Sequence, residues 1–227
     1  MRVAVLNDVH GNLPALEAVL AEVAALDVDR IVCGGDVVMG PFPRECVERL
    51  VDLGAVFVRG NADRVPAGVP GASWVEEQLG PLSLAFLREL PESISLGGVV
   101  YCHGSPRSDE EILTRVSPDE RIRVALAGVE ERLVIGGHTH VQFDREVDGI
   151  RFVNAGSIGM PYEGRSGAFW ALVDGLEVEL RQTPYAVEAA VVAIRASGYP
   201  GLEDMCSWLL DPKDPDEISA YFESIAS

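Results

Sequence analysis

The sequence predicts an α/β fold in which two mixed β-sheets face each other and helices cover their outer sides. In the first half, short apolar runs alternate with amphipathic helical stretches, which is typical of a parallel sheet covered by helices. In the second half, glycine-containing turns join neighbouring apolar runs, which is typical of antiparallel hairpins. The 227 residues are 48% hydrophobic and 24% charged, as in globular proteins. We therefore expect one domain over residues 1–227, with a C-terminal helical segment at about 185–227.

The first half is predicted to contain three strands, each followed by polar residues. Apolar side chains recur at helical spacing over residues 13–26, and a second helix over residues 43–53 stops at Gly54. The strands are the apolar runs at residues 2–6, 30–33 and 55–58.

The second half is predicted to contain three hairpins, with turns at Gly97-Gly98, Asp148-Gly149 and Asp174-Gly175. Their strands are residues 93–96 with 99–102, 142–147 with 150–153, and 168–173 with 177–181. One further strand spans residues 133–135. Helices are expected over residues 73–90, with an interruption near Gly80-Pro81, over residues 117–127, and two or three times after residue 185.

The formal net charge of −18 limits the classes of partner. Non-specific nucleic-acid binding needs a positive surface, and an anionic membrane surface would repel this chain. No apolar stretch is long enough to span a membrane, and the amino-terminal run is too short for a signal peptide. We therefore expect a cytoplasmic protein whose partner is a small molecule; the oligomeric state cannot be predicted.

Imidazole, carboxylate and amide side chains follow five of the predicted strands. Because the carboxyl ends of parallel strands meet at one edge of a sheet, these groups are expected to lie together. Seven ligands are too many for one tetrahedral zinc ion but suit two ions that share a bridging carboxylate. The donors favour Mn, Fe, Co, Ni or Zn over Ca or Mg. The predicted ligands are Asp8, His10, Asp36, Asn61, His103, His138 and His140.

Each of these residues also has a simpler interpretation when it is taken alone. Asp8 could cap the first helix, Asp36 could occupy a turn, and Asn61 could be a left-handed turn residue. Their joint placement after strands favours the metal site.

The motifs together resemble the calcineurin-like metallophosphoesterase superfamily, in particular its small stand-alone prokaryotic phosphodiesterase-type branch. The matching segments are Asp8-Val9-His10, Gly35-Asp36, Gly60-Asn61, His103 and Gly137-His138-Thr139-His140. Asn154-Ala155-Gly156-Ser157 is similar to the branch's N-P-G-S segment, with Ala155 in place of proline. The resemblance implies a four-layer α-β-β-α sandwich.

The resemblance also implies a division of the ligands between two divalent transition-metal ions, for which Mn is favoured. One ion would be held by Asp8, His10, Asp36 and His140, and the other by Asp36, Asn61, His103 and His138. A hydroxide bridging both ions would attack phosphorus. The implied substrates are small phosphodiesters or nucleotide phosphoanhydrides. The alternatives are a phosphomonoesterase or protein phosphatase, and a non-catalytic scaffold of the same fold.

One position departs from the family pattern. Many relatives have a histidine directly after the Gly-Asn motif, proposed to protonate the leaving group, whereas this chain has Ala62 and then Asp63. Either Asp63, His10 or a water supplies the proton, or the leaving group is already a weak base. A capping or ion-pair role is the alternative for Asp63.

The predicted substrate-binding residues are Asn12, Asn61, Arg64 and Arg107, since amides and guanidinium groups bind phosphate. A solvated surface position is the alternative for each arginine. Substrate choice is expected to depend on the loops around residues 63–90, 104–116 and 155–167.

Overall fold

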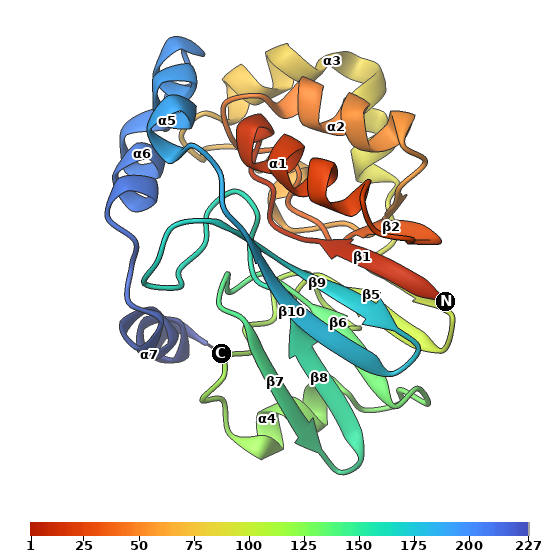
Figure 1. The fold of residues 1–227 in the computed structure, drawn as a ribbon. Helices are drawn as coiled ribbons and strands as arrows, with labels where there is room; N and C mark the ends of the chain where they lie inside the picture. The colour runs from red at the N-terminus through yellow and green to blue at the C-terminus, as the bar shows by residue number, and fades with distance from the viewer. Residues whose placement is uncertain (227) are drawn as a thin grey trace.

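Two mixed five-stranded sheets lie face to face in the computed structural model, which describes residues 1–226 (Figure 1). In the first sheet β1, β2 and β3 are parallel, and β9 and β10 add an antiparallel edge. The strand order is β10-β9-β1-β2-β3. The strands are β1 (Arg2–Leu6), β2 (Arg30–Cys33), β3 (Val56–Phe57), β9 (Ala168–Asp174) and β10 (Glu177–Thr183).

The second sheet has the order β4-β5-β6-β8-β7. Its three central strands β5, β6 and β8 are parallel, and the edge strands β4 and β7 are antiparallel to their neighbours. The strands are β4 (Ser93–Leu96), β5 (Val99–Cys102), β6 (Leu133–Gly136), β7 (Phe143–Val147) and β8 (Ile150–Asn154). All three predicted hairpins, β4–β5, β7–β8 and β9–β10, are therefore confirmed.

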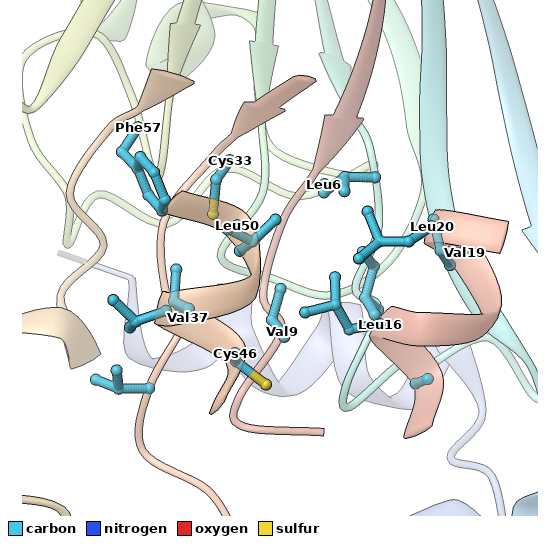
Figure 2. Close-up of a cluster of buried hydrophobic side chains, with 14 of the residues drawn as sticks. Leu6, Val9, Leu16, Val19, Leu20, Cys33, Val37, Cys46, Leu50 and Phe57 are labelled. Carbon is cyan, nitrogen blue, oxygen red and sulfur yellow. The ribbon is translucent and has the colours of Figure 1, made fainter. Parts of the chain in front are cut away.

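Helices cover the outer faces of both sheets, so the four-layer α-β-β-α arrangement is confirmed. Three helices, α1 (Leu13–Val23), α2 (Pro43–Asp52) and α3 (Ala72–Arg88), pack on the first sheet, and α4 (Asp119–Ala125) packs on the second. Figure 2 shows Leu16 and Leu20 of α1 and Leu50 of α2 gathered over Leu6 and Cys33 of the first sheet.

Both faces of the central strands are buried. In β1, Ala4 and Leu6 belong to the core beneath the helices, whereas Val3 and Val5 belong to the core between the sheets. Because successive side chains of a strand point to opposite faces, such a strand must be apolar throughout. Burial on both faces holds each central strand firmly in place. The polar residues that directly follow each strand are therefore held in place as well.

Three helices form the end of the chain: α5 (Val187–Ala196), α6 (Leu202–Leu210) and α7 (Pro215–Ile225). The first two share a small apolar core, and α7 lies apart from them beside the second sheet (Figure 1). The predicted helical segment at 185–227 is thus three helices, and its last residue, Ser227, lies outside the described residues. Among residues 1–226, no helix is both long enough and apolar enough to cross a membrane.

The predicted and observed boundaries differ at several element ends. The first helix stops at Val23 instead of residue 26, because the chain turns there toward β2. The fourth begins at Asp119, since Pro118 has an extended ψ of 142° and serves as its N-cap. The predicted interruption of α3 is confirmed, because Gly80 adopts φ 70° and ψ 172°. That residues 1–227 form one domain remains a prediction.

Candidate metal centre

All seven predicted metal ligands lie just beyond the carboxyl ends of parallel strands. Asp8 and His10 follow β1, Asp36 follows β2, and Asn61 follows β3. From the second sheet, His103 follows β5, while His138 and His140 follow β6. Because the two sheets lie face to face, the residues after the strand ends of both sheets lie close together and form one site.

The backbone at these positions is held in an unusual conformation. Five ligand residues adopt positive φ: Asp8 (53°), His10 (45°), Asp36 (53°), His138 (70°) and His140 (57°). Positive φ is uncommon outside glycine, costs on the order of 1–3 kcal/mol, and is concentrated at functional sites. Hydrogen bonds between neighbouring loops hold it, such as those from the amides of Asp8 and His10 to the carbonyls of Gly35 and Asp36.

Two glycines allow the ligands to approach so closely. A β-carbon on Gly60 would lie 2.1 Å from Oδ1 of Asp36, and one on Gly137 would lie 2.5 Å from Oδ2 of Asp8. Any side chain at either position would therefore displace a ligand carboxylate.

The ligand atoms form two groups, each with its atoms within 4.8 Å of one another. In the first, Nε2 of His140 lies 3.1 Å from Oδ1 of Asp8 and 3.2 Å from Nε2 of His10. In the second, Nε2 of His103 lies 3.1 Å from Nδ1 of His138 and 3.4 Å from Oδ2 of Asp36.

Asp36 belongs to the second group and also approaches the first. The Oδ2 atom that approaches His103 is also 3.7 Å from Nε2 of His10, a member of the first group. Asn61 joins the second group through its Oδ1, which lies 3.1 Å from Nε2 of His103. Asp36 thus faces ligand atoms of both groups. The division of the seven ligands between two ions remains a prediction.

Backbone carbonyls orient two of the imidazoles. Nδ1 of His103 lies 3.0 Å from the carbonyl oxygen of Gly34, and Nδ1 of His140 lies 2.7 Å from that of Met160. An Nδ1–H donated to these carbonyls leaves the Nε2 lone pair of each ring directed into the site. This is the orientation that a metal-binding histidine requires.

The centre is suited to cations. Oδ1 of Asp8 is sealed from solvent and has no hydrogen-bond partner among residues 1–226. Burial opposes ionisation of Asp8, yet the neighbouring imidazoles of His140 and His103 outweigh it and lower the pKa of this carboxyl. Burial likewise disfavours the charged form of His103, but Asp36 and Asp8 raise its pKa to about 10. The carboxylates of Asp8 and Asp36 therefore favour positive charge nearby. The imidazole, carboxylate and amide donors fit divalent metal ions.

Asp63 is directed at the backbone rather than at the ligand atoms. Its side chain is fully buried, and its oxygens accept hydrogen bonds from the amides of Asp36 (2.8 Å), Val37 (2.8 Å) and Gly60 (2.9 Å). With its oxygens engaged in this way, Asp63 shapes the loop that carries Asp36. This geometry favours a positioning role over the predicted role as proton donor.

The other predicted substrate contacts are also engaged elsewhere. Asn12 is fully buried; it caps α1 by accepting from the amide of Ala15 and donates to the carbonyl of Gly159. Arg64 pairs with Asp109 and Glu110, and Arg107 pairs with Glu111. Within residues 1–226 neither arginine forms a hydrogen bond or ion pair with a metal-ligand side chain, whereas Asn61 lies 3.1 Å from His103.

Sequence reasoning missed Tyr162 and Trp208. The ring of Tyr162 stacks on that of His140 with centroids 5.0 Å apart and an angle of 18°, and Trp208 of α6 packs edge-on against Tyr162. The only signal in the sequence was the position of Tyr162 in a loop expected to influence substrate choice. The contact with α6 is tertiary and has no local pattern.

Comparison with known proteins shows the family. A model described as the calcineurin-like phosphoesterase superfamily domain matches residues 1–174, which is more than half of the chain. The chain belongs to the calcineurin-like phosphoesterase superfamily. The matched region contains every strand that supplies a metal ligand.

Individual proteins resemble the chain over most of its length. A metallophosphoesterase from Sphaerobacter thermophilus superposes with a TM-score of 0.80 at 29% identity, covering 93% of this chain and 98% of that one. A hypothetical protein from Pyrococcus horikoshii OT3 gives 0.80 at 25% identity, with 94% and 99% covered. An uncharacterised protein of Methanocaldococcus jannaschii is 28% identical over 231 residues, covering 87% of this chain and 93% of that protein.

These three relatives are themselves covered almost completely, over 98%, 99% and 93% of their own length. Coverage of 93% of this chain must extend beyond residue 174, so part of the C-terminal helical segment belongs to the shared fold. Superfamily membership implies bound divalent metal ions, and the two ligand groups supply the donors for them.

Proposed function

We propose that the protein is a two-metal-dependent phosphoesterase that hydrolyses small phosphodiesters or nucleotide phosphoanhydrides. The observation that carries the proposal is the pair of ligand groups, in which Asp36 of the second group also faces His10 of the first. Two ions held by such a pair would form a clamp for phosphoryl transfer. We propose Mn as the native metal, with Fe, Co, Ni and Zn as the alternatives.

Each part of the centre has a distinct task in this proposal. Asp8, His10 and His140 would hold one ion, and His103, His138 and Asn61 would hold the other. Asp36 would be a ligand of both. When bound, two divalent ions stabilise the charge on the phosphoryl group and activate water for attack. Asp63 keeps the Asp36 loop in its left-handed conformation through the backbone amides.

The position of Ala62 favours substrates with good leaving groups. The Ala62 amide donates to Oδ1 of Asp36 at 2.8 Å, but its methyl group cannot deliver a proton. His10 is a weak candidate acid, since Nε2 already faces Asp36 and His140 and burial lowers its pKa to about 4. General acid catalysis is typically worth about 10²–10⁴-fold, and alkoxide leaving groups need it most. We therefore favour phosphoanhydrides and activated diesters over alkyl monoesters.

We further propose a cytoplasmic location, a small phosphorylated substrate as the main partner, and no non-specific binding to nucleic acid or membranes. The net charge of −18 supports the last point, because phosphate backbones and anionic lipids carry the same sign.

The test is hydrolysis by protein stripped with EDTA and reloaded with Mn²⁺. An aryl phosphodiester, an aryl phosphomonoester and a dinucleoside polyphosphate are compared as substrates. The inactive variant is His138→Ala, which removes one ligand of the second group. The matched control is Arg195→Ala, on the exposed face of α5.

Turnover of the diester or polyphosphate by wild type and Arg195→Ala, lost in His138→Ala, is the expected result. Turnover of the monoester alone would make the protein a phosphatase and would overturn the argument from Ala62. Binding of two metal equivalents without any turnover would indicate a non-catalytic scaffold.

A further inference from the structure

Tyr162 packs against a predicted metal ligand, His140, but is not itself one of the predicted ligands. It lies in the loop between β8 and β9, only 9% exposed, and this loop runs beside α6 (Figure 1). One face of its ring lies nearly parallel to His140, and the edge contact with Trp208 has centroids 6.0 Å apart at 81°. Its amide donates to the carbonyl of His140 at 3.1 Å. Ring and backbone are therefore both fixed relative to a metal ligand.

The hydroxyl group of Tyr162, in contrast, has no hydrogen-bond partner among residues 1–226. Buried tyrosine hydroxyls usually find one, so a free hydroxyl on a side chain this buried needs an explanation. Among residues 1–226, only two side-chain polar atoms are both inaccessible to water and without a hydrogen-bond partner: Oδ1 of Asn7 and Oδ1 of Asp8. The Tyr162 hydroxyl is also unpaired but is not one of these two atoms, so it must be accessible to solvent.

The contact with His140 keeps this hydroxyl beside the metal centre. The two rings stack with their centroids 5.0 Å apart, and His140 is a member of the first ligand group. A phenol held next to a ligand of that group has an O–H to donate to an anion bound there.

We propose that Tyr162 is a substrate-binding residue whose hydroxyl donates a hydrogen bond to a phosphoryl oxygen of the substrate, on the Asp8–His10–His140 side of the centre. The proposal rests on the proposed phosphoesterase function and adds a residue to it. It also assigns a role to the C-terminal helical segment, because Trp208 of α6 packs edge-on against the Tyr162 ring and helps to hold it in place. Ala62, in contrast, lies against Asp36, to which its amide donates.

The test compares Tyr162→Phe, which removes only the hydroxyl, with Tyr199→Phe. Tyr199 is a matched control: it is 7% exposed and packs edge-on against Trp74, away from the metal ligands. Both variants are reloaded with Mn²⁺ and compared with wild type at equal metal content. Three quantities are measured: the metal equivalents bound, the Kd of inorganic phosphate by equilibrium dialysis, and kcat and KM for the aryl phosphodiester.

A hydrogen bond to a charged group predicts about 10-fold or more weaker phosphate binding in Tyr162→Phe. The value of kcat/KM should fall by a similar factor, whereas metal content and Tyr199→Phe should match wild type. The phosphate measurement does not depend on turnover. If wild type hydrolyses none of the substrates, the proposed function fails while weaker phosphate binding would still support the Tyr162 contact.

Unchanged phosphate affinity and unchanged kcat/KM in Tyr162→Phe overturn the inference and leave the phosphoesterase proposal intact. Loss of metal in Tyr162→Phe also overturns it, since the hydroxyl would then serve the protein's own structure.

Discussion

At the scale of single residues, Asp63 shows how a buried carboxylate can control a metal ligand without touching the metal. Its oxygens accept from amides on both sides of Asp36 and from Gly60, which joins the loops after β2 and β3. Those loops carry Asp36 and Asn61. Burial and the Asp36 carboxylate raise the pKa of Asp63 to about 7, whereas the amide donors favour its ionised form.

Substitution Asp63→Asn separates positioning from proton donation. The new amide group would point N–H donors at backbone N–H donors, which should destabilise the protein by about 1–3 kcal/mol. Disturbed support of a ligand loop should weaken metal binding by roughly 10–100-fold. Denaturant unfolding and equilibrium dialysis with Mn²⁺ measure the two effects. A variant that folds and binds metal normally but has no turnover would restore the proton-donor role.

The seven ligands could be predicted from sequence because each has a local signal, a polar residue directly after an apolar strand. Their tertiary meeting follows from the parallel arrangement of these strands. The environment of Asp63 and the stacking of Tyr162 could not be predicted, since both depend on contacts between segments distant along the chain. The paired states of Arg64 and Arg107 likewise depend on which carboxylates the neighbouring loops present.

Among the helices and strands, the C-terminal helices stand out because they form hydrogen bonds with loops at the edge of both sheets. Glu223 of α7 accepts from Oγ1 of Thr114 (2.8 Å) and from Nη1 of Arg121 (2.7 Å). The first bond connects α7 to the loop before α4, and the second connects it to α4 itself. Tyr185, just before α5, accepts from Nδ2 of Asn12 at 3.4 Å. These contacts connect the helices to loops that follow β1 and β5.

Replacing Glu223 by Gln should make this attachment independent of pH. Burial raises the pKa of Glu223, but hydrogen bonds from Ser117 and Thr114 and the charge of Arg121 outweigh it and lower the pKa from 4.5. A carboxyl whose pKa is lower in the folded state stabilises the folded protein when the pH is above its pKa in the unfolded state. This stabilisation disappears as the pH falls through its pKa in the folded state. Denaturant unfolding should show Glu223→Gln roughly 1 kcal/mol less stable at pH 7, with the difference shrinking below pH 4.5. A constant difference across this range would contradict the ionic role.

Removal of the Trp208 side chain should loosen Tyr162 without touching a metal ligand. Since Trp208 is only partly buried, Trp208→Ala should cost roughly 2 kcal/mol, about half of the usual loss for a fully buried tryptophan. Phosphate should bind the variant more weakly while Mn²⁺ binds as in wild type. Wild-type phosphate affinity in a folded Trp208→Ala variant would show that the support from α6 is dispensable.

At the scale of the whole molecule, the two sheets form one scaffold whose opposed strand ends build one centre. The first sheet supplies Asp8, His10, Asp36 and Asn61, and the second supplies the other three histidines. Metal ions bound at these residues would therefore link the two sheets directly. Such binding should stabilise the folded protein as a whole and not only the loops.

Metal loading should accordingly raise the melting temperature. At a free Mn²⁺ concentration of about 100 times Kd, binding stabilises the native state by about 2.7 kcal/mol, or about 5–10 °C for a chain of this length. Differential scanning calorimetry before and after EDTA treatment measures the shift, with His140→Ala as the variant that should lose part of it. An unchanged melting temperature in protein that has bound Mn²⁺ would rule out a metal link between the sheets.

The two-metal centre is tested most directly by anomalous diffraction at the manganese edge from crystals of the Mn²⁺-reloaded protein. Two peaks about 3.5–4 Å apart are expected, one within Asp8, His10 and His140 and one within His103, His138 and Asn61, with Asp36 contacting both. A single peak, or peaks away from these side chains, would contradict the two-metal account.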